Sequence, residues 1–253
     1  MNKFFKNFCL VLIAVALGVI SLSSIVNIYE KREGILSVFK GDCNKGYGKC
    51  QNDEYWAKEI LNGGYILHFR HAEREKWIDV QMYDALESDV HNNGKNESRY
   101  AESEYFKRAV CLNDRGLVQA TAMGEHLSKI NLPIEKVVSS VSCRSRQTAE
   151  LAFGGYDSLH RLLVHDGPFK ELPEERLRNL INFYLDLPVP KKGNIIVSAH
   201  NGVVRCEMFV NCNNENLHLE EGGFYVIKAR DNGLYLEHEF HFFHLFQKIF
   251  YPR

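Results

Sequence analysis

The chain has 253 residues, of which 45% are hydrophobic and 25% are charged, and its formal net charge at pH 7 is −1. This length and composition are typical of one large globular domain or two small ones. The near-zero charge argues against a protein that binds nucleic acid through a broad basic surface, although it leaves room for a local basic pocket.

The N-terminal segment has the pattern of a membrane-targeting sequence. Lys3 and Lys6 precede an apolar stretch from Phe8 to about Ile28, and charged residues follow directly. The stretch is close to the roughly 20 residues that a helix needs to span a bilayer, and it lacks a clear small-residue cleavage site. We expect residues 1–32 to be an uncleaved signal-anchor, with a cleaved signal peptide as the alternative. The domain behind it would then be exported to the periplasmic or extracellular side.

The cysteines fit an exported domain. One lies in the apolar stretch and six follow it, and an even number of cysteines outside the cytoplasm predicts disulfides. Short spacing favours the pairs Cys43–Cys50 and Cys206–Cys212. The remaining two are Cys111 and Cys143. The sequence does not fix the pairing, and scattered reduced thiols are the alternative.

A lead-in segment at 33–62, irregular except for one short helix near its end, separates the N-terminal segment from the domain that we expect at 63–253. The first strand of this domain is predicted at Tyr65–Phe69, and it ends on Arg70-His71. Residues 74–110 are rich in Glu, Asn, Tyr and Ser, which predicts a polar insertion after the first strand.

The rest of the chain alternates between helical and strand patterns. The predicted elements are a helix starting at Asn113–Gly116, a strand at Lys136–Ser140, helices at Ser145–Phe153 and Glu174–Leu185, a strand at Asn194–Ser198, a helix at Val203–Val210, and strands at Phe224–Ala229 and Leu234–Phe240. An Asp-Asn-Gly turn between the last two strands predicts an antiparallel pair. This alternation predicts an α/β fold with a mostly parallel central sheet and helices on both faces.

Basic residues follow three of these strands. Arg70 and His71 end the first, Arg144 comes shortly after the strand at 136–140, and His200 follows the strand at 194–198. Because ligands bind beyond the carboxyl ends of parallel strands, we expect these side chains to converge. Arginine donates two parallel hydrogen bonds to phosphate oxygens, and an imidazole can attack phosphorus. The pattern therefore predicts a site for a phosphoryl group.

Four segments carry a resemblance to a known family. They are, in order, LHFRHAER at 67–74, CLNDRGLVQA at 111–120, SSVSCRSRQTAELAFG at 139–154 and VSAHNGVVR at 197–205. In motif, order and spacing they resemble the histidine phosphatase superfamily, whose fold is phosphoglycerate-mutase-like. The resemblance covers residues 63 to about 240. The Phe-Gly-x-Trp-Glu pattern of the mutase branch is absent, which favours a phosphatase.

The resemblance implies a role for each residue of the site. His71 would be the nucleophile and would carry a phosphohistidine. Arg70, Arg144 and His200 would hold the phosphoryl oxygens, and His200 would also stabilise the transferring group. Glu171 is the carboxylate that we expect to act as general acid.

Alternatives to Glu171 are Glu174, Glu175 and Glu73, which lie in or near the same motifs. The chain also departs from the family pattern at two positions where glycine is usual. Ala72 follows the nucleophile, and a methyl group there is tolerated if the backbone φ is not positive, although it could narrow the pocket. Asn201 follows His200, and asparagine tolerates unusual dihedral angles.

The implied function is metal-independent hydrolysis of a phosphomonoester, with no cofactor. The late histidines at 238, 241 and 244 lie among aromatic residues, which favours packing over a metal site. An exported enzyme would meet a small phosphorylated substrate or phosphoglycan of the envelope or the extracellular space. The Arg-His-Ala-Glu motif is similar to that of exported lipopolysaccharide core heptose-phosphate phosphatases, which suggests a phosphosugar. The alternatives are a non-catalytic anion-binding module on the same fold and a phosphotransferase.

Overall fold

The computed structural model describes residues 52–75, 107–165, 169–213 and 216–251. The predicted signal-anchor at 1–32, most of the lead-in segment and most of the polar insertion lie outside these residues, as do Cys43 and Cys50. The domain limits and the membrane anchor therefore stay predictions. Within the described ranges, no helix has both the length and the apolar character needed to cross a bilayer.

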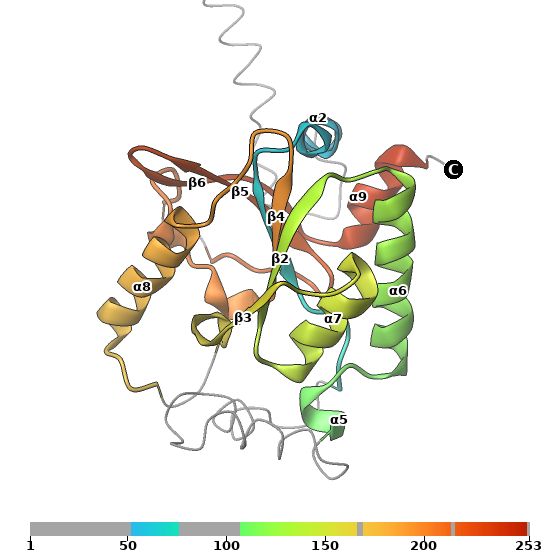
Figure 1. Cartoon of the computed structure of the whole chain (residues 1–253), viewed down its shortest axis with the longest axis horizontal. Coiled ribbons are helices and arrows are strands. Elements are labelled where there is room, and N and C mark those ends of the chain that lie inside the picture. The colour runs from blue at the N-terminus through green and yellow to red at the C-terminus, as the bar shows by residue number, and fades with distance from the viewer. Residues whose placement is uncertain (1–51, 76–106, 166–168, 214–215, 252–253) are drawn as a thin grey trace, which may run out of the picture. The chain divides into compact units, whose positions relative to one another are not determined.

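Six strands form one sheet at the centre of the molecule (Figure 1). The strands are β1 (Ile66–Arg70), β2 (Ile134–Ser140), β3 (Ser158–His160), β4 (Asn194–Ala199), β5 (Phe224–Arg230) and β6 (Gly233–Phe240). Their order is β3-β2-β4-β1-β5-β6. The first four in this order run parallel, whereas β5 is antiparallel to β1, and β6 to β5.

Helices cover both faces of the sheet. The α-helices are α2 (Asp53–Glu59), α5 (Lys107–Val110), α6 (Asp114–Lys129), α7 (Cys143–Phe153), α8 (Pro173–Leu185) and α9 (Phe243–Phe250). The 3₁₀ turns are η1 (Ile60–Asn62), η2 (Arg161–Leu163), η3 (Asn201–Val203) and η4 (Cys206–Met208). In Figure 1, α6, α7 and α9 lie on one side of the strands and α8 on the other. The predicted α/β fold class, with a mostly parallel sheet and helices on both faces, is confirmed.

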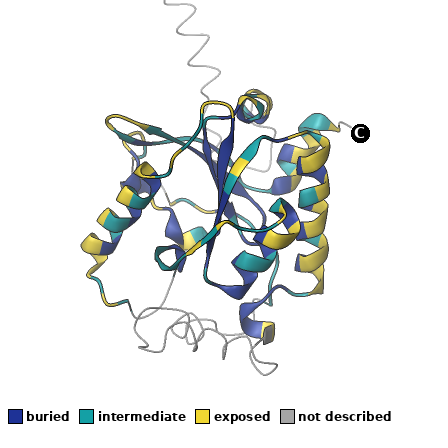
Figure 2. Ribbon diagram, viewed as in Figure 1, coloured by how far each residue is buried: buried dark blue, intermediate teal, exposed yellow. Residues whose placement is uncertain are grey.

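The core has two halves, one on each face of the sheet. Leu67 and Phe69 of β1 belong to the half that includes α2, α6, α7 and α9, whereas Ile66 belongs to the half that includes α8. Every residue of β4 is buried, as expected for a central parallel strand covered on both faces (Figure 2). The alternation along β1 sends His68 and Arg70 to the same face as Ile66.

One predicted element is wrong. Residues 203–210 form no α-helix but the end of η3 and the turn η4, joined through extended backbone at Val204 and Arg205. The Cys206–Cys212 disulfide closes this segment into a short loop, and Phe209 forms a parallel bridge with Leu234. These tertiary constraints override a helical pattern that consecutive β-branched valines support only weakly.

Two disulfides lie in the described residues. Cys206–Cys212 confirms the predicted short loop, with a Cα–Cα distance of 5.3 Å. Cys111–Cys143 joins the segment after α5 to the first residue of α7, with a Cα–Cα distance of 4.9 Å. The sequence did not predict that these two cysteines pair with each other.

The late histidines lie in packed or hydrogen-bonded positions. The ring of His238, on β6, is buried and its Nε2 lies 2.8 Å from Asp53 Oδ1 on α2. His241 Nδ1 lies 2.8 Å from the carbonyl oxygen of His218. Across the described ranges, no group of three or more potential ligands is arranged to hold a metal ion.

Candidate active site

The sheet register brings the two motif histidines together. β1 and β4 are parallel neighbours in which Arg70 pairs with Ala199, and the His71 amide donates to the Ala199 carbonyl at 2.9 Å. His71 and His200 therefore leave the sheet side by side. Their ring centroids are 5.3 Å apart, in an edge-to-face arrangement.

The hydrogen bonds of His71 fix its tautomer. Its Nδ1 lies 2.7 Å from the carbonyl oxygen of Ala72, which can only accept, so Nδ1 carries the proton. The neutral ring then has its lone pair on Nε2. The ring is 4% exposed, so the structure holds this lone pair in a fixed direction inside the site.

The surroundings of His71 keep the imidazole neutral. Burial lowers the pKa of His71 well below 6.5, and the guanidinium groups of Arg144 and Arg70, and then that of Arg74, lower it further. The hydrogen bond to Ala72 opposes this shift without reversing it. An imidazole that resists protonation among cations is suited to act as a nucleophile toward an anion.

His200 is oriented by two serine hydroxyls. Its Nε2 lies 3.2 Å from Ser140 Oγ and 3.4 Å from Ser145 Oγ. Its Nδ1 is buried and has no hydrogen-bond partner in the described part of the chain. Burial, followed by the charge of Arg144, lowers the pKa of His200 well below 6.5. A buried nitrogen without a partner beside the nucleophile is suited to a ligand oxygen.

Two further histidines, His68 and His165, each contact His200. The His68 Nε2 donates to the His200 carbonyl at 3.0 Å, so His68 Nδ1 accepts from the Tyr184 hydroxyl at 2.7 Å. The ring of His165 stacks on that of His200, with centroids 4.8 Å apart. The sequence singled out neither His68 nor His165 as part of the site.

Arg144 lies on the first turn of α7 and is fully buried. Its Nη1 lies 3.5 Å from the Val110 carbonyl oxygen. The unpaired backbone N–H groups of a helix N-terminus attract anions, so α7 adds to the positive field of the guanidinium. Arg146, two residues further along α7, donates through Nε to the Val141 carbonyl at 3.1 Å.

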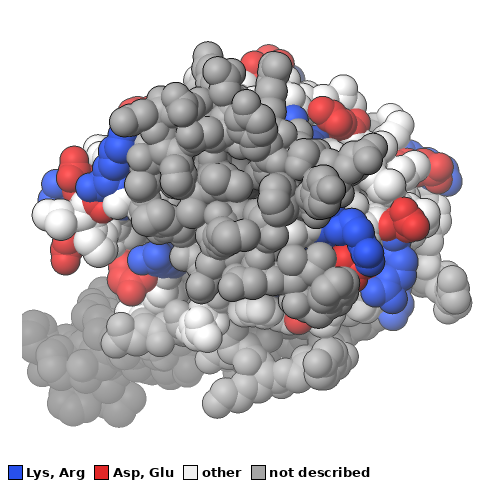
Figure 3. All heavy atoms as spheres, turned by 90° about the horizontal axis from the view of Figure 1, so that it is seen from below, with Lys and Arg blue, Asp and Glu red and all other residues white. Residues whose placement is uncertain are grey.

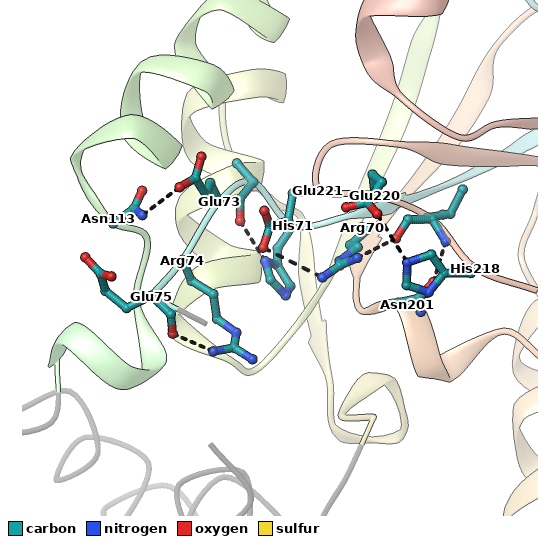
Figure 4. Close-up of polar contacts among 12 residues, drawn as sticks. Arg70, His71, Glu73, Arg74, Glu75, Asn113, Asn201, His218, Glu220 and Glu221 are labelled. Carbon is teal, nitrogen blue, oxygen red and sulfur yellow. Dashed lines mark hydrogen bonds and ion pairs between the residues drawn. The ribbon is translucent and has the colours of Figure 1, made fainter. Parts of the chain in front are cut away.

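Arg70 is held by the segment that precedes β5 (Figure 4). It donates to the Leu219 carbonyl, and its Nη2 forms an ion pair with Glu221 Oε1 at 3.7 Å. Its buried Nε has no partner among the described residues. The sequence did not single out Glu221, because an acidic residue before a Gly-Gly turn has no pattern that distinguishes it from a surface residue.

The candidate acids differ in position. Glu73 points away from His71, and its Oε1 accepts from Asn113 Nδ2 at 3.1 Å and from Arg115 (Figure 4). Glu174 and Glu175 are exposed on the first turn of α8. Glu171 lines a cavity of about 310 Å³ together with His165, which stacks on His200. The lining of this cavity includes none of Arg70, His71, Arg144 and His200, so the role of Glu171 as general acid stays a prediction.

The two departures from the family pattern are accommodated. Among the described non-glycine residues only Asn131 has a positive φ, so Ala72 and Asn201 have ordinary backbone conformations. Ala72 is fully buried against Leu112 and Ala120 rather than exposed to a cavity. Asn201 Oδ1 accepts from the Leu219 amide at 2.6 Å, next to the carbonyl that holds Arg70.

The face that surrounds the carboxyl ends of the strands shows charges of both signs in its described part (Figure 3). This agrees with the formal net charge of −1.

One protein-family model matches part of the chain. Residues 94–167 match the model of the histidine phosphatase superfamily, branch 1. The matched range includes the motifs around Arg115 and Arg144, whereas His71 and His200 lie outside it. The match supports the predicted resemblance for the two motifs that lie within it, at 111–120 and 139–154. No curated protein sequence shows significant similarity to the chain.

Solved structures with low sequence identity align over most of their length. An open reading frame product of Mycobacterium tuberculosis shares 14% identity over 70% of this chain and 96% of its own, with a TM-score of 0.46. The protein TTHB049 of Thermus thermophilus shares 18% over 70% and 99%, with a TM-score of 0.43. The protein histidine phosphatase SixA, complexed with tungstate, shares 13% over 70% and 96%, also with 0.43.

Proposed function

We propose that this protein is a histidine phosphatase that hydrolyses a phosphomonoester, without a metal ion, through a phosphohistidine formed on His71. The observation that carries the proposal is the state of His71: a neutral imidazole, with Nδ1 fixed by the Ala72 carbonyl, beside the buried guanidinium of Arg144 and the partly buried one of Arg70. His200 is neutral too, but its Nε2 contacts hydroxyls, which can donate or accept, so no carbonyl fixes its tautomer as Ala72 fixes that of His71.

In the first step, His71 Nε2 attacks phosphorus and the bond from phosphorus to the ester oxygen breaks. Arg70 and Arg144 hold the phosphoryl oxygens, and His200 Nδ1 donates to one of them while its Nε2 accepts from a serine hydroxyl. A carboxylic acid, for which we propose Glu171, gives its proton to the leaving oxygen, so that the product is an alcohol.

In the second step, water attacks the phosphohistidine. Glu171, now a carboxylate, takes a proton from the water as the new bond to phosphorus forms. The bond between phosphorus and Nε2 breaks, inorganic phosphate leaves, and His71 returns to its neutral state. Arg70, Arg144 and His200 stabilise the transferring phosphoryl group in both steps.

We further propose that the substrate is a phosphosugar or phosphoglycan of the envelope or the extracellular space. Three features support this: the targeting pattern at 1–32, the disulfides in the domain, and the cavity that Glu171 lines. Phe169 and Arg205 also line this cavity, and an aromatic ring beside charged groups is compatible with a polyhydroxylated leaving group.

Release of inorganic phosphate by the full chain, from a panel of sugar phosphates and other phosphomonoesters in the presence of a chelator, tests the proposal. We expect turnover that the chelator does not affect and that His71→Ala abolishes. Glu171→Gln should lower turnover, most strongly with poor leaving groups, whereas the matched variant Glu73→Gln should retain most of it.

The intermediate can be trapped separately. Rapid denaturation during turnover of a ³²P-labelled substrate should leave an alkali-stable, acid-labile label that maps to His71. A folded protein that binds phosphate but neither turns over nor acquires a label would be an anion-binding module instead. Label without release of free phosphate would indicate a phosphotransferase.

A further inference from the structure

The Cys111–Cys143 disulfide lies directly beside the phosphate-binding arginine. Cys143 is the first residue of α7 and Arg144 the second. Both half-cystines are buried, at 2% and 5% exposure, and they pack with Ala109 and Val110 of α5. The bond joins residues 32 positions apart, so it ties two separate segments together at the entrance to α7.

The segment that Cys111 belongs to contacts both sides of the site. We call residues Val110–Asn113 the clamp. On one side, the Val110 carbonyl lies 3.5 Å from Arg144 Nη1, and the Leu112 amide donates to Gln147 Oε1 at 2.8 Å.

On its other side, the clamp holds the loop that follows the nucleophile. The Asn113 amide donates to the Glu73 carbonyl at 3.2 Å, and Asn113 Nδ2 donates to the Glu73 carboxylate at 3.1 Å. Glu73 is two residues after His71. The clamp therefore connects the turn that carries Arg144 to the loop that carries His71.

The hydrogen bonds of the clamp are too weak to fix it alone. A donor–acceptor distance of 3.5 Å is at the long limit of a hydrogen bond, and one ordinary hydrogen bond contributes only about 0.5–1.5 kcal/mol. The disulfide is the covalent connection between the clamp and α7. Without it, the two hydrogen bonds from the clamp to α7 would lose their covalent support.

We propose that the Cys111–Cys143 disulfide is a positioning element for Arg144, so that full phosphatase activity requires this bond to be oxidised. The proposal rests on the proposed function, since it assigns Arg144 the phosphoryl group as ligand. The protein would then be fully active only in an oxidising compartment, because a reducing compartment would convert the disulfide to two thiols.

The second disulfide provides a matched control. Cys206–Cys212 closes a loop with a sequence separation of six around η4, and none of its described contacts involves Arg144. Both pairs join buried or half-buried residues of the same domain. Loss of the second pair should therefore test for general effects of removing a disulfide.

The experiment compares Cys111→Ser/Cys143→Ser with Cys206→Ser/Cys212→Ser in the full chain. We measure kcat, KM, inhibition by inorganic phosphate, and circular dichroism with thermal unfolding. With the fold retained, the first pair should lower kcat/KM about tenfold to a hundredfold, as expected for a misplacement of roughly 1 Å, and should weaken phosphate inhibition. The control pair should change neither value more than about twofold.

A pH profile separates positioning from simple loss of stability. Arg144, Arg70, Arg74 and the neutral His200 surround His71, and the three cations all hold its pKa down. A displaced Arg144 should move the acid limb of kcat/KM to higher pH in the first variant only. Wild-type protein that is reduced and then re-oxidised should lose and regain activity in parallel.

Each outcome decides the proposal. Unchanged kcat/KM and phosphate inhibition in a folded variant, or equal losses in both pairs, would overturn it. Unfolding of the first variant under conditions where the control is folded would make the bond a structural cross-link and overturn it too. If the wild type hydrolyses nothing, the proposed function fails separately, and phosphate affinity of the two variants still tests the positioning of Arg144.

Discussion

His68 occupies a strand position that alternation alone would assign to an apolar side chain. It is fully buried between two tyrosines, Tyr184 and Tyr225, and it bonds both the Tyr184 hydroxyl and the backbone of His200. A buried polar group is tolerated only if its hydrogen bonds are made. His68 therefore depends on Tyr184 in order to hold the backbone of His200.

Tyr184→Phe should be clearly destabilising. The change removes the donor to His68 Nδ1 and leaves a buried acceptor without a partner, which costs about 1–3 kcal/mol. Because His68 also positions His200, kcat should fall as well. Urea unfolding and steady-state kinetics measure the two effects.

Tyr225→Phe is the matched control for this change. Its hydroxyl is buried and lacks a hydrogen-bond partner within the described ranges, although its ring also stacks near His68. Removing it should alter the unfolding free energy by less than about 0.5 kcal/mol. Equal effects of the two substitutions would contradict the assigned role of Tyr184.

The sequence predicted the residues that share the site but not the residues that orient them. Arg70, His71, Arg144 and His200 follow predicted strands, and the geometry of a parallel sheet makes such positions converge. His165 approaches His200 only through a loop whose path depends on tertiary packing. No local pattern in the sequence carries that information.

Helix α6 approaches the nucleophile loop more closely than a side chain would allow. A Cβ atom on Gly116 would lie 2.0 Å from the Glu73 carbonyl oxygen. Asn113 caps this helix by accepting from the Gly116 amide at 2.7 Å, and it also contacts Glu73. The glycine therefore permits the contact between α6 and the residue two positions after His71.

Gly116→Ala has two effects of opposite sign on the free energy of unfolding. Alanine favours the helix over glycine by about 1 kcal/mol. The clash is with backbone, which cannot rotate away, so we expect a net destabilisation of about 1–3 kcal/mol and a fall in kcat/KM as the loop moves. Thermal unfolding and phosphate release measure both.

Val118→Ala on the same helix isolates the propensity effect. Val118 is 70% exposed, so its replacement should be neutral or slightly stabilising and should leave activity unchanged. A Gly116→Ala variant as stable and active as this control would show that α6 can withdraw from Glu73 at little cost.

Elements with a clear apolar period and a capping residue could be predicted from the sequence. Helix α6 begins after the cap Asn113, and the antiparallel pair β5 and β6 turns at Asp231-Asn232 as expected. The strand β3, with only three residues, is too short to show a period. The helix predicted at 203–210 was wrong because a disulfide and a β-bridge set the path of this segment.

The molecule as a whole buries several histidines in their neutral form. His68, His71 and His200 lie on neighbouring strands β1 and β4 or directly after them, and burial is the largest cause of the lowered pKa of each. The unfolded chain has no such burial, so its histidines titrate near their ordinary pKa of 6.5. The folded and unfolded states therefore bind different numbers of protons in mildly acidic solution.

This difference predicts acid lability. Below pH 6.5 the unfolded state takes up protons that the folded state refuses, so the free energy of unfolding falls as the pH falls. The pKa of His68 is lowered from 6.5 to about 4, and at about 1.4 kcal/mol per pKa unit His68 alone accounts for a loss on the order of 3 kcal/mol across that window. Urea unfolding at about pH 7.5 and about pH 5 should show a clear loss at the lower pH.

His68→Gln tests the origin of that loss. Glutamine can still donate and accept hydrogen bonds but does not titrate, so the variant should be less stable at neutral pH and should lose less stability on acidification than the wild type. The slope of the unfolding free energy against pH gives the number of protons taken up on unfolding. Between pH 6.5 and about 4, this number should be smaller in the variant than in the wild type by up to one proton. An unchanged slope would mean that His68 is already protonated in the folded state, and its Nδ1 could not then accept from Tyr184.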